Sequence, residues 1–127
     1  MCREVPYMDS IAKKLHDSSV SCALVFGSTE FCTELESRGI RVVTVDRESH
    51  LPAEDVELDD AVQAVLISVD KSFDFYSASI ATRYIHERNV EFFCTDNKPT
   101  AEDGSPGAYC LASIVATATS KAPVFTF

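Results

Sequence analysis

Short apolar runs separated by amphipathic segments constrain the fold of this chain more than any other feature. One run, from Val65 to Val69, reads Val-Leu-Ile-Ser-Val and is followed by Asp70. A short β-branched run between polar residues favours a strand that is buried on both faces of a parallel sheet. We therefore expect Asp70 at the carboxyl end of a central strand, the edge where open α/β sheets bind ligands.

Other segments of the chain extend this pattern. Further strands are predicted at residues 22–26, 41–45, 90–95 and 123–127. Helices are predicted at residues 7–17, from Gly27-Ser28-Thr29 to Gly39, at 73–88 with Phe73 facing the sheet, and at 108–119. Helices that alternate with buried strands predict an α/β fold, a three-layer α/β/α sandwich with a mainly parallel sheet. A length of 127 residues fits one domain, so residues 1–127 are treated as a single unit.

The charge of the chain excludes some partners. A net charge of -9 argues against nucleic acid, because phosphate binding draws on clustered Lys and Arg. The acids gather in residues 54–60, which we interpret as a solvated loop; a cation site is the alternative, but EF-hand spacing is missing. No stretch approaches the 18 apolar residues of a membrane span, and the N-terminus lacks an export signal. We expect neither nucleic acid nor a membrane as a partner.

The cysteines indicate a cellular compartment rather than a metal site or a disulfide. Five cysteines occur without any C-x-x-C pair, which signals neither a zinc cluster nor a disulfide framework. A reducing, cytoplasmic location is therefore predicted. The three histidines are far apart in the sequence and are interpreted as surface residues.

Two irregular segments are candidates for function. The turn Gly27-Ser28-Thr29 could hold an anion at a helix N-terminus, but a lone Gly without Walker or dinucleotide spacing favours a simple helix N-cap. Residues 96–107 form the longest polar irregular stretch, and loops of this length are commonly functional or mobile. Asp70 itself has a structural alternative, as N-cap of the helix that follows it.

Several segments together resemble one enzyme family. They are Val-Leu-Ile-Ser-Val-Asp-Lys-Ser-Phe-Asp-Phe-Tyr at 65–76, Phe-Phe-Cys-Thr-Asp at 92–96, Ser-Pro-Gly-Ala at 105–108, and Ala-Leu-Val-Phe-Gly at 23–27 followed by Glu34, Leu35, Glu36 and Gly39. In order and spacing they resemble the C2-type cap domain of haloacid-dehalogenase (HAD) phosphatases, in the group of 4-nitrophenylphosphatase, phosphoglycolate phosphatase and pyridoxal phosphatase. The resemblance spans residues 7–127.

This resemblance implies a role in substrate choice. Such phosphoric monoester hydrolases pair a catalytic core, which holds a D-x-D aspartate nucleophile and Mg²⁺, with a cap domain that closes over the active site. The family positions nearest a small phosphate ester are Asp70, Ser72, Thr95, Asp96 and Lys98. Asp96 stands where the family has Asn, and Ser72 where some members have His.

The sequence departs from the family in its catalytic residues. No two aspartates are separated by a single residue, so the D-x-D motif is absent. The resemblance therefore implies a cap domain, as a fragment or a degenerate member, with no catalytic residue, metal site or cofactor of its own. Mg²⁺ belongs to the full-length family enzyme, and the catalytic core is the expected partner. A face left uncovered by that core makes a homodimer a further prediction.

Two other functions remain open on the residues alone. A receiver-like signalling module would use Asp70 as phospho-acceptor, Thr95 as switch hydroxyl and Lys121 as its lysine, although the first strand lacks the acidic pair that holds Mg²⁺. An autonomous metal-dependent phosphatase would need a nucleophile other than aspartate, for which no Ser or Cys motif is visible.

Overall fold

The computed structural model describes residues 5–127, and they form a five-stranded sheet with all strands parallel. The strand order is β2-β1-β3-β4-β5. The strands are β1 (Cys22–Phe26), β2 (Arg41–Val43), β3 (Ala64–Ile67), β4 (Glu91–Cys94) and β5 (Val124–Phe125). The helices are α1 (Val5–Asp17), α2 (Thr29–Ser37), α3 (Phe75–Arg88) and α4 (Ala108–Thr119), with a single 3₁₀ turn, η2 (Ala53–Asp55). The predicted α/β class with a parallel sheet is confirmed.

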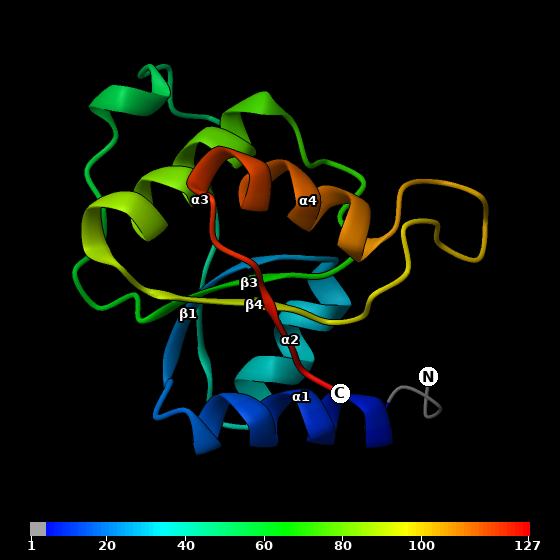
Figure 1. Cartoon of the computed structure of the whole chain (residues 1–127). Coiled ribbons are helices and arrows are strands. Elements are labelled where there is room, and N and C mark those ends of the chain that lie inside the picture. The colour runs from blue at the N-terminus through cyan, green and yellow to red at the C-terminus, as the bar shows by residue number, and fades with distance from the viewer. Residues whose placement is uncertain (1–4) are drawn as a thin grey trace.

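Helices cover both faces of the sheet, so the molecule has three layers (Figure 1). Leu24 and Val65 belong to the hydrophobic cluster under α3 and α4. Ala23 and Leu66 belong to a second cluster under α1 and α2. Successive residues of a strand point to opposite faces, so a central strand in this arrangement must be apolar along its whole length. Burial on both faces of the sheet therefore explains the apolar runs of the sequence.

The central strand is shorter than predicted. β3 pairs with β1 up to Phe26 and Ile67, and with β4 up to Ile67 and Cys94. The predicted strand to Asp70 is therefore wrong by three residues, because the regular pairing with both neighbours ends at Ile67. Asp70 lies in the loop beyond the carboxyl end of β3.

The start of α3 also differs from the prediction. The helix begins at Phe75, and the Asp74 side chain accepts a hydrogen bond of 2.8 Å from the Ser77 backbone N–H. Asp74, not Asp70, is thus the helix N-cap, and the alternative structural role for Asp70 is wrong. Phe73 precedes the helix and packs edge-on against Phe26, with 5.3 Å between ring centroids.

The interpretation of Ser28 as a simple helix cap is confirmed. Its side chain accepts a hydrogen bond of 3.1 Å from the Phe31 backbone N–H at the start of α2. Beyond the other end of α2, Gly39 adopts a φ of 87°, a left-handed conformation that glycine adopts without strain.

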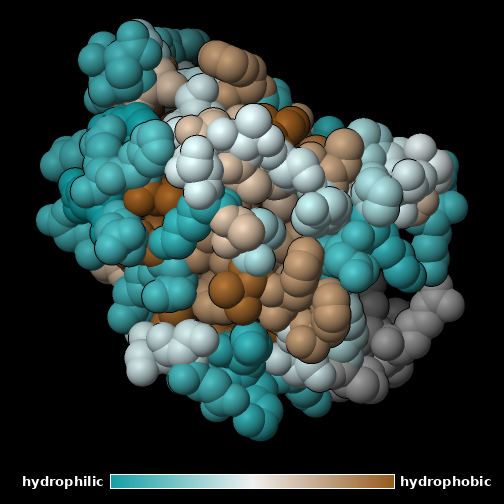
Figure 2. Space-filling model, viewed as in Figure 1, coloured by the Kyte–Doolittle hydropathy of each residue, from teal (hydrophilic) through white to brown (hydrophobic). Residues whose placement is uncertain are grey.

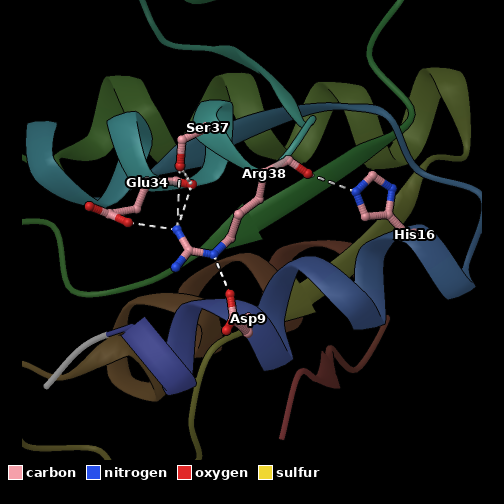
Figure 3. A network of polar contacts seen from close by, with 5 residues as sticks. All are labelled: Asp9, His16, Glu34, Ser37 and Arg38. Carbon is pink, nitrogen blue, oxygen red and sulfur yellow. Dashed lines mark hydrogen bonds and ion pairs between the residues drawn. The ribbon is translucent and has the colours of Figure 1, made fainter. Parts of the chain in front are cut away.

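Arg38 joins the two helices on one face of the sheet (Figure 3). Its guanidinium lies 2.6 Å from a carboxylate oxygen of Asp9 on α1 and 2.6 Å from one of Glu34 on α2. The Arg38 carbonyl oxygen lies 3.0 Å from Nε2 of His16. The two charge-assisted hydrogen bonds of the Arg38 guanidinium, to Asp9 and to Glu34, fix the end of α2 against α1.

The connection from β2 to β3 contains no α-helix, unlike the other connections between strands. It contains only the single turn η2, and Arg83 of α3 holds it through hydrogen bonds of 2.8 and 2.6 Å to the carbonyl oxygens of Ala53 and Val56. A cavity of about 210 Å³ lies beside this connection, with Val43 and Tyr76 in its wall. Among residues 5–127, no helix has the length and apolar character needed to cross a membrane.

Candidate functional site

Asp70 lies at the carboxyl edge of the sheet, in the loop that follows β3. Its side chain is only 11% exposed. One carboxylate oxygen accepts a hydrogen bond of 2.9 Å from the Ser72 backbone N–H, and the other lies 3.7 Å from the guanidinium of Arg47. Both oxygens are therefore engaged within the protein, which holds the loop after β3 in place.

Arg47 is the residue of this edge that sequence reasoning missed. It follows β2 and lies 3.2 Å from the Asp74 carboxylate as well as near Asp70, so it bridges the loop after β3 and the start of α3. Burial acts to raise the pKa of Asp74, but hydrogen bonds from Ser77 and Arg47 outweigh it and lower that pKa. The only signal in the sequence was a basic residue soon after a predicted strand.

The loop after β3 reaches across to the loop after β4. Lys71 forms an ion pair of 3.0 Å with Asp103. The pKa of Asp103 is lowered, first by hydrogen bonds from Ser105 and then by Lys71. Ser72 is exposed beside this contact. The two loops that carry the predicted substrate positions are therefore tied together.

Thr95 is not available at the surface. It is 1% exposed, and its hydroxyl donates a hydrogen bond of 3.2 Å to the Ser68 hydroxyl. The Thr95 carbonyl oxygen accepts a hydrogen bond of 3.1 Å from the Tyr7 hydroxyl. Within residues 5–127, the Thr95 side chain therefore has a structural role: it joins the carboxyl-terminal ends of β3 and β4.

Asp96 and Lys98 open a loop that is ordered by its own hydrogen bonds. Asp96 accepts a hydrogen bond of 2.9 Å from the Lys98 backbone N–H, while the Lys98 side chain is exposed. Further along, Thr100 and Pro106 form an antiparallel bridge, and a Cβ on Gly107 would lie 2.7 Å from the Lys98 carbonyl oxygen. The 96–107 segment is a compact hairpin-like loop that only glycine closes this tightly.

The five predicted positions thus divide into two kinds. Ser72 and Lys98 present exposed side chains on neighbouring loops, whereas Asp70, Thr95 and Asp96 bond within the protein. The two described cavities are lined by other residues, beside β2 and at the start of α3.

The thiol next to Thr95 in the sequence is not activated as a nucleophile. Cys94, at the end of β4, is fully buried, and burial raises its pKa to about 11. Within residues 5–127, no group of three or more His, Cys, Asp or Glu side chains could hold a metal ion.

The receiver-like alternative fails on the position of Lys121, not on the strand order. Lys121 precedes β5, and its Nζ donates a hydrogen bond of 3.0 Å to the Val90 carbonyl oxygen, which precedes β4. In a parallel sheet these positions lie at the amino edge, opposite the edge of Asp70 and Thr95. The three residues are not brought together, so that interpretation is wrong.

Comparison with known proteins gives a match in structure only. No family model matches the sequence, and no curated protein matches it. Among solved structures, NagD from Escherichia coli K-12 superposes with a TM-score of 0.73 at 15% identity, covering 94% of this chain and 42% of its own. A glycerol phosphate phosphatase from Mycobacterium tuberculosis, crystallised with calcium, gives 0.72 at 19% identity, covering 94% and 33%. It was also crystallised with magnesium.

A third solved structure extends the same result. The p-nitrophenyl phosphatase from Archaeoglobus fulgidus gives a TM-score of 0.64 at 16% identity, covering 91% of this chain and 41% of its own. The chain therefore spans between a third and about two-fifths of the length of these three structures. At such identities the likeness establishes the fold alone: a five-stranded parallel α/β sheet with four helices, as found within these three structures.

Proposed function

We propose that this chain is the substrate-specificity cap domain of a Mg²⁺-dependent HAD-type phosphatase, such as a 4-nitrophenylphosphatase, and that it is inactive alone. The observation that carries the proposal is the coverage of the structural match. Nearly the whole chain, 94%, superposes on phosphatases of which it spans only 33 to 42%. A module of that size is a domain of such an enzyme rather than a counterpart of the whole.

The placement of the two ends of the chain supports an inserted domain. The Tyr7 hydroxyl, near the start of α1, bonds to the Thr95 carbonyl oxygen. The Thr126 backbone N–H donates a hydrogen bond of 3.1 Å to the Cys94 carbonyl oxygen. Both contacts are therefore made to adjacent residues at the carboxyl end of β4, on the same side of the molecule in Figure 1. A domain whose ends are adjacent can be inserted into a host chain without distorting either.

The proposed role assigns tasks to the predicted site residues. Ser72 and Lys98 contact a small phosphate ester, and Asp70, Thr95 and Asp96 hold the loops that present them. The partner is the HAD catalytic core, which supplies the aspartate nucleophile and binds Mg²⁺. The described cysteines, Cys22, Cys32, Cys94 and Cys110, are free thiols, which fits a cytoplasmic enzyme.

The first test is hydrolysis of p-nitrophenyl phosphate by the purified chain, with Mg²⁺ and with EDTA. We expect no turnover in either condition, because residues 5–127 contain no metal-binding cluster. Turnover that EDTA abolishes, in a preparation free of contaminating phosphatase, would contradict the proposal and point to an unrecognised nucleophile.

A chimaera separates a cap domain from any other part of such an enzyme. The segment of E. coli NagD that superposes on this chain is replaced by the chain itself. We expect a folded chimaera that retains hydrolysis of p-nitrophenyl phosphate and prefers different phosphate esters from NagD. A Lys98→Ala version should shift that preference again, with Lys13→Ala on the exposed side of α1 as the matched control. A folded chimaera without any activity would show that the segment carries the chemistry, against the proposal.

A further inference from the structure

The cavity beside the crossover from β2 to β3 has room for a small organic molecule. Its volume is about 210 Å³, and Leu24, Val43 and Ile80 contribute to its wall. An apolar cavity of about 150 Å³ is large enough to bind benzene. None of the five predicted substrate positions lines this cavity, so its role is not explained by the function proposed above.

One hydroxyl in the wall of the cavity has no partner. Tyr76 of α3 lines the cavity, and its hydroxyl oxygen is buried without a hydrogen bond to any part of residues 5–127. Tyr84 lines the same cavity, but its hydroxyl accepts a hydrogen bond of 2.7 Å from the Asp59 backbone N–H. A phenol hydroxyl can both donate and accept. The Tyr76 hydroxyl is therefore available to a polar atom of a ligand.

The crossover makes the surroundings of this cavity acidic. Residues 44–60 contain seven Asp and Glu side chains, whereas Arg47 is their only Lys or Arg. Three of these acids, Asp46, Glu57 and Asp59, line the cavity itself. Figure 2 shows mainly hydrophilic side chains at its upper left, where Figure 1 places η2 and the residues around it.

The arginines near the cavity do not neutralise all three of these acids. Arg41 pairs with Asp59, at 3.4 Å. Arg47 pairs with carboxylates at the end of β3 and the start of α3, and Arg83 bonds to the crossover only through backbone carbonyl oxygens. Within residues 5–127, Asp46 and Glu57 therefore keep exposed carboxylates without an ion pair.

We propose that this cavity binds a small organic cation, a molecule with an aromatic ring, a hydroxyl and a protonated amine. The apolar wall covers the ring, the Tyr76 hydroxyl bonds to the ligand hydroxyl, and Asp46 and Glu57 attract the ammonium group. The same two carboxylates repel an anion. The ligand therefore differs in class from the phosphate ester of the proposed cap domain.

Tyramine is the probe, because it carries a phenol hydroxyl and an alkyl amine on one ring. Tyrosol has a hydroxyl in place of that amine, and phloretate has a carboxylate there. The test is an NMR titration of the ¹⁵N-labelled chain at neutral pH, where the amine is protonated. We expect tyramine to bind with a Kd of about 1 mM or tighter and to shift the amides of residues 44–59 and of the first turns of α3. Tyrosol should bind about threefold more weakly, and phloretate more weakly still.

Two variants separate the hydroxyl from the charge. Tyr76→Phe removes only the unpartnered hydroxyl, so it should weaken tyramine binding by about fivefold without lowering the free energy of unfolding. Glu57→Gln should weaken tyramine binding by about threefold and reduce its advantage over tyrosol. Glu36→Gln, at an exposed position of α2 on the other face of the sheet, removes the same charge away from the cavity and is the matched control. We expect it to bind tyramine like the wild type.

Several results would overturn the proposal. One is the absence of saturable tyramine binding up to about 10 mM, and another is an equal Kd for tyramine and tyrosol. Equal weakening by Glu57→Gln and Glu36→Gln would show that tyramine follows the overall charge of -9 rather than the cavity. An unchanged Kd in Tyr76→Phe would show that the ligand does not reach this hydroxyl. These measurements do not use phosphatase activity, so this proposal and the cap-domain proposal can fail separately.

Discussion

Two buried threonine hydroxyls differ in whether they have a partner. Thr126 is 3% exposed, and its hydroxyl makes no hydrogen bond within residues 5–127. Thr95 is 1% exposed and donates to the Ser68 hydroxyl. A buried polar group without a partner loses its hydrogen bonds to water and gains none in the protein, so it lowers stability. The two residues therefore predict opposite responses to the same substitution.

We expect Thr126→Val to leave the free energy of unfolding unchanged or to raise it by about 1 kcal/mol. Thr95→Val should lower it by about 1 kcal/mol or more, because the Ser68 hydroxyl loses its partner in the core. Urea unfolding of both variants measures the difference. Equal destabilisation would show that the Thr126 hydroxyl has a partner after all.

Gly107 is required by contact rather than by its own backbone dihedrals. A Cβ there would meet the Lys98 carbonyl oxygen at 2.7 Å and the Thr100 backbone at 3.1 Å. We expect Gly107→Ala to lower the free energy of unfolding by about 1 to 3 kcal/mol, the range of an overpacked site. Ala118→Gly, at an exposed position in α4, is a control for backbone entropy alone, with an expected cost near 1 kcal/mol. Thermal unfolding compares the two.

At the scale of elements, the N-cap of α3 distinguishes Asp74 from Asp70. Asp74→Ala should lower the free energy of unfolding by about 0.5 to 1 kcal/mol, the lower part of the usual range because this side chain is 56% exposed. The pKa of Asp74 is lowered in the folded protein, so its stabilisation is present above the unfolded pKa of 3.8 and is lost as pH falls below it.

Asp70→Ala is the comparison, since this residue bonds the loop but not the helix. In Asp70→Ala, we expect the circular dichroism of α3 to stay helical. Only in Asp74→Ala should the backbone amides of its first turn lose protection from hydrogen exchange. Loss of the first turn in Asp70→Ala would contradict the assignment of the N-cap.

Burial of Cys94 at the end of β4 predicts a loss of stability in alkali. Desolvation raises its pKa from 9.0 to about 11, so above pH 9 the unfolded chain releases this proton while the folded chain keeps it. The free energy of unfolding should therefore fall between pH 9 and 11, by about 2 kcal/mol or less from this group. Cys94→Ala should remove that part of the pH dependence, as measured by urea unfolding at each pH.

Element type could be predicted from the sequence, but element ends could not. The apolar runs are local and reflect burial on both faces, so the strands and the helices between them were placed correctly. β3 ends at Ile67 because the neighbouring ladders end there, which no local pattern records. Arg47 was missed for the same reason, since its partners Asp70 and Asp74 lie on other elements.

At the scale of the whole molecule, the parallel topology decides which residues meet. Sequence order alone allowed Asp70, Thr95 and Lys121 to form one site, and only the position of Lys121 before β5 separates them. The predicted class and the parallel sheet are confirmed, while the cap-domain role and the substrate positions stay predictions. The sequence could not predict that the loops after β3 and β4 lie close together, because the ion pair between Lys71 and Asp103 depends on how both loops fold.

The single turn η2 has a consequence for local opening of the native state. The crossover around it packs beside a cavity and is held to α3 by hydrogen bonds with Arg83 and with the Tyr84 hydroxyl, whereas β3 is paired on both sides. Segments outside the paired strands and the α-helices open at lower free energy than the core. In amide hydrogen exchange, residues 44–59 should therefore lose protection first, and Arg83→Ala should speed that exchange while β3 stays protected. A limited protease would cut this crossover before any other part of the sheet region.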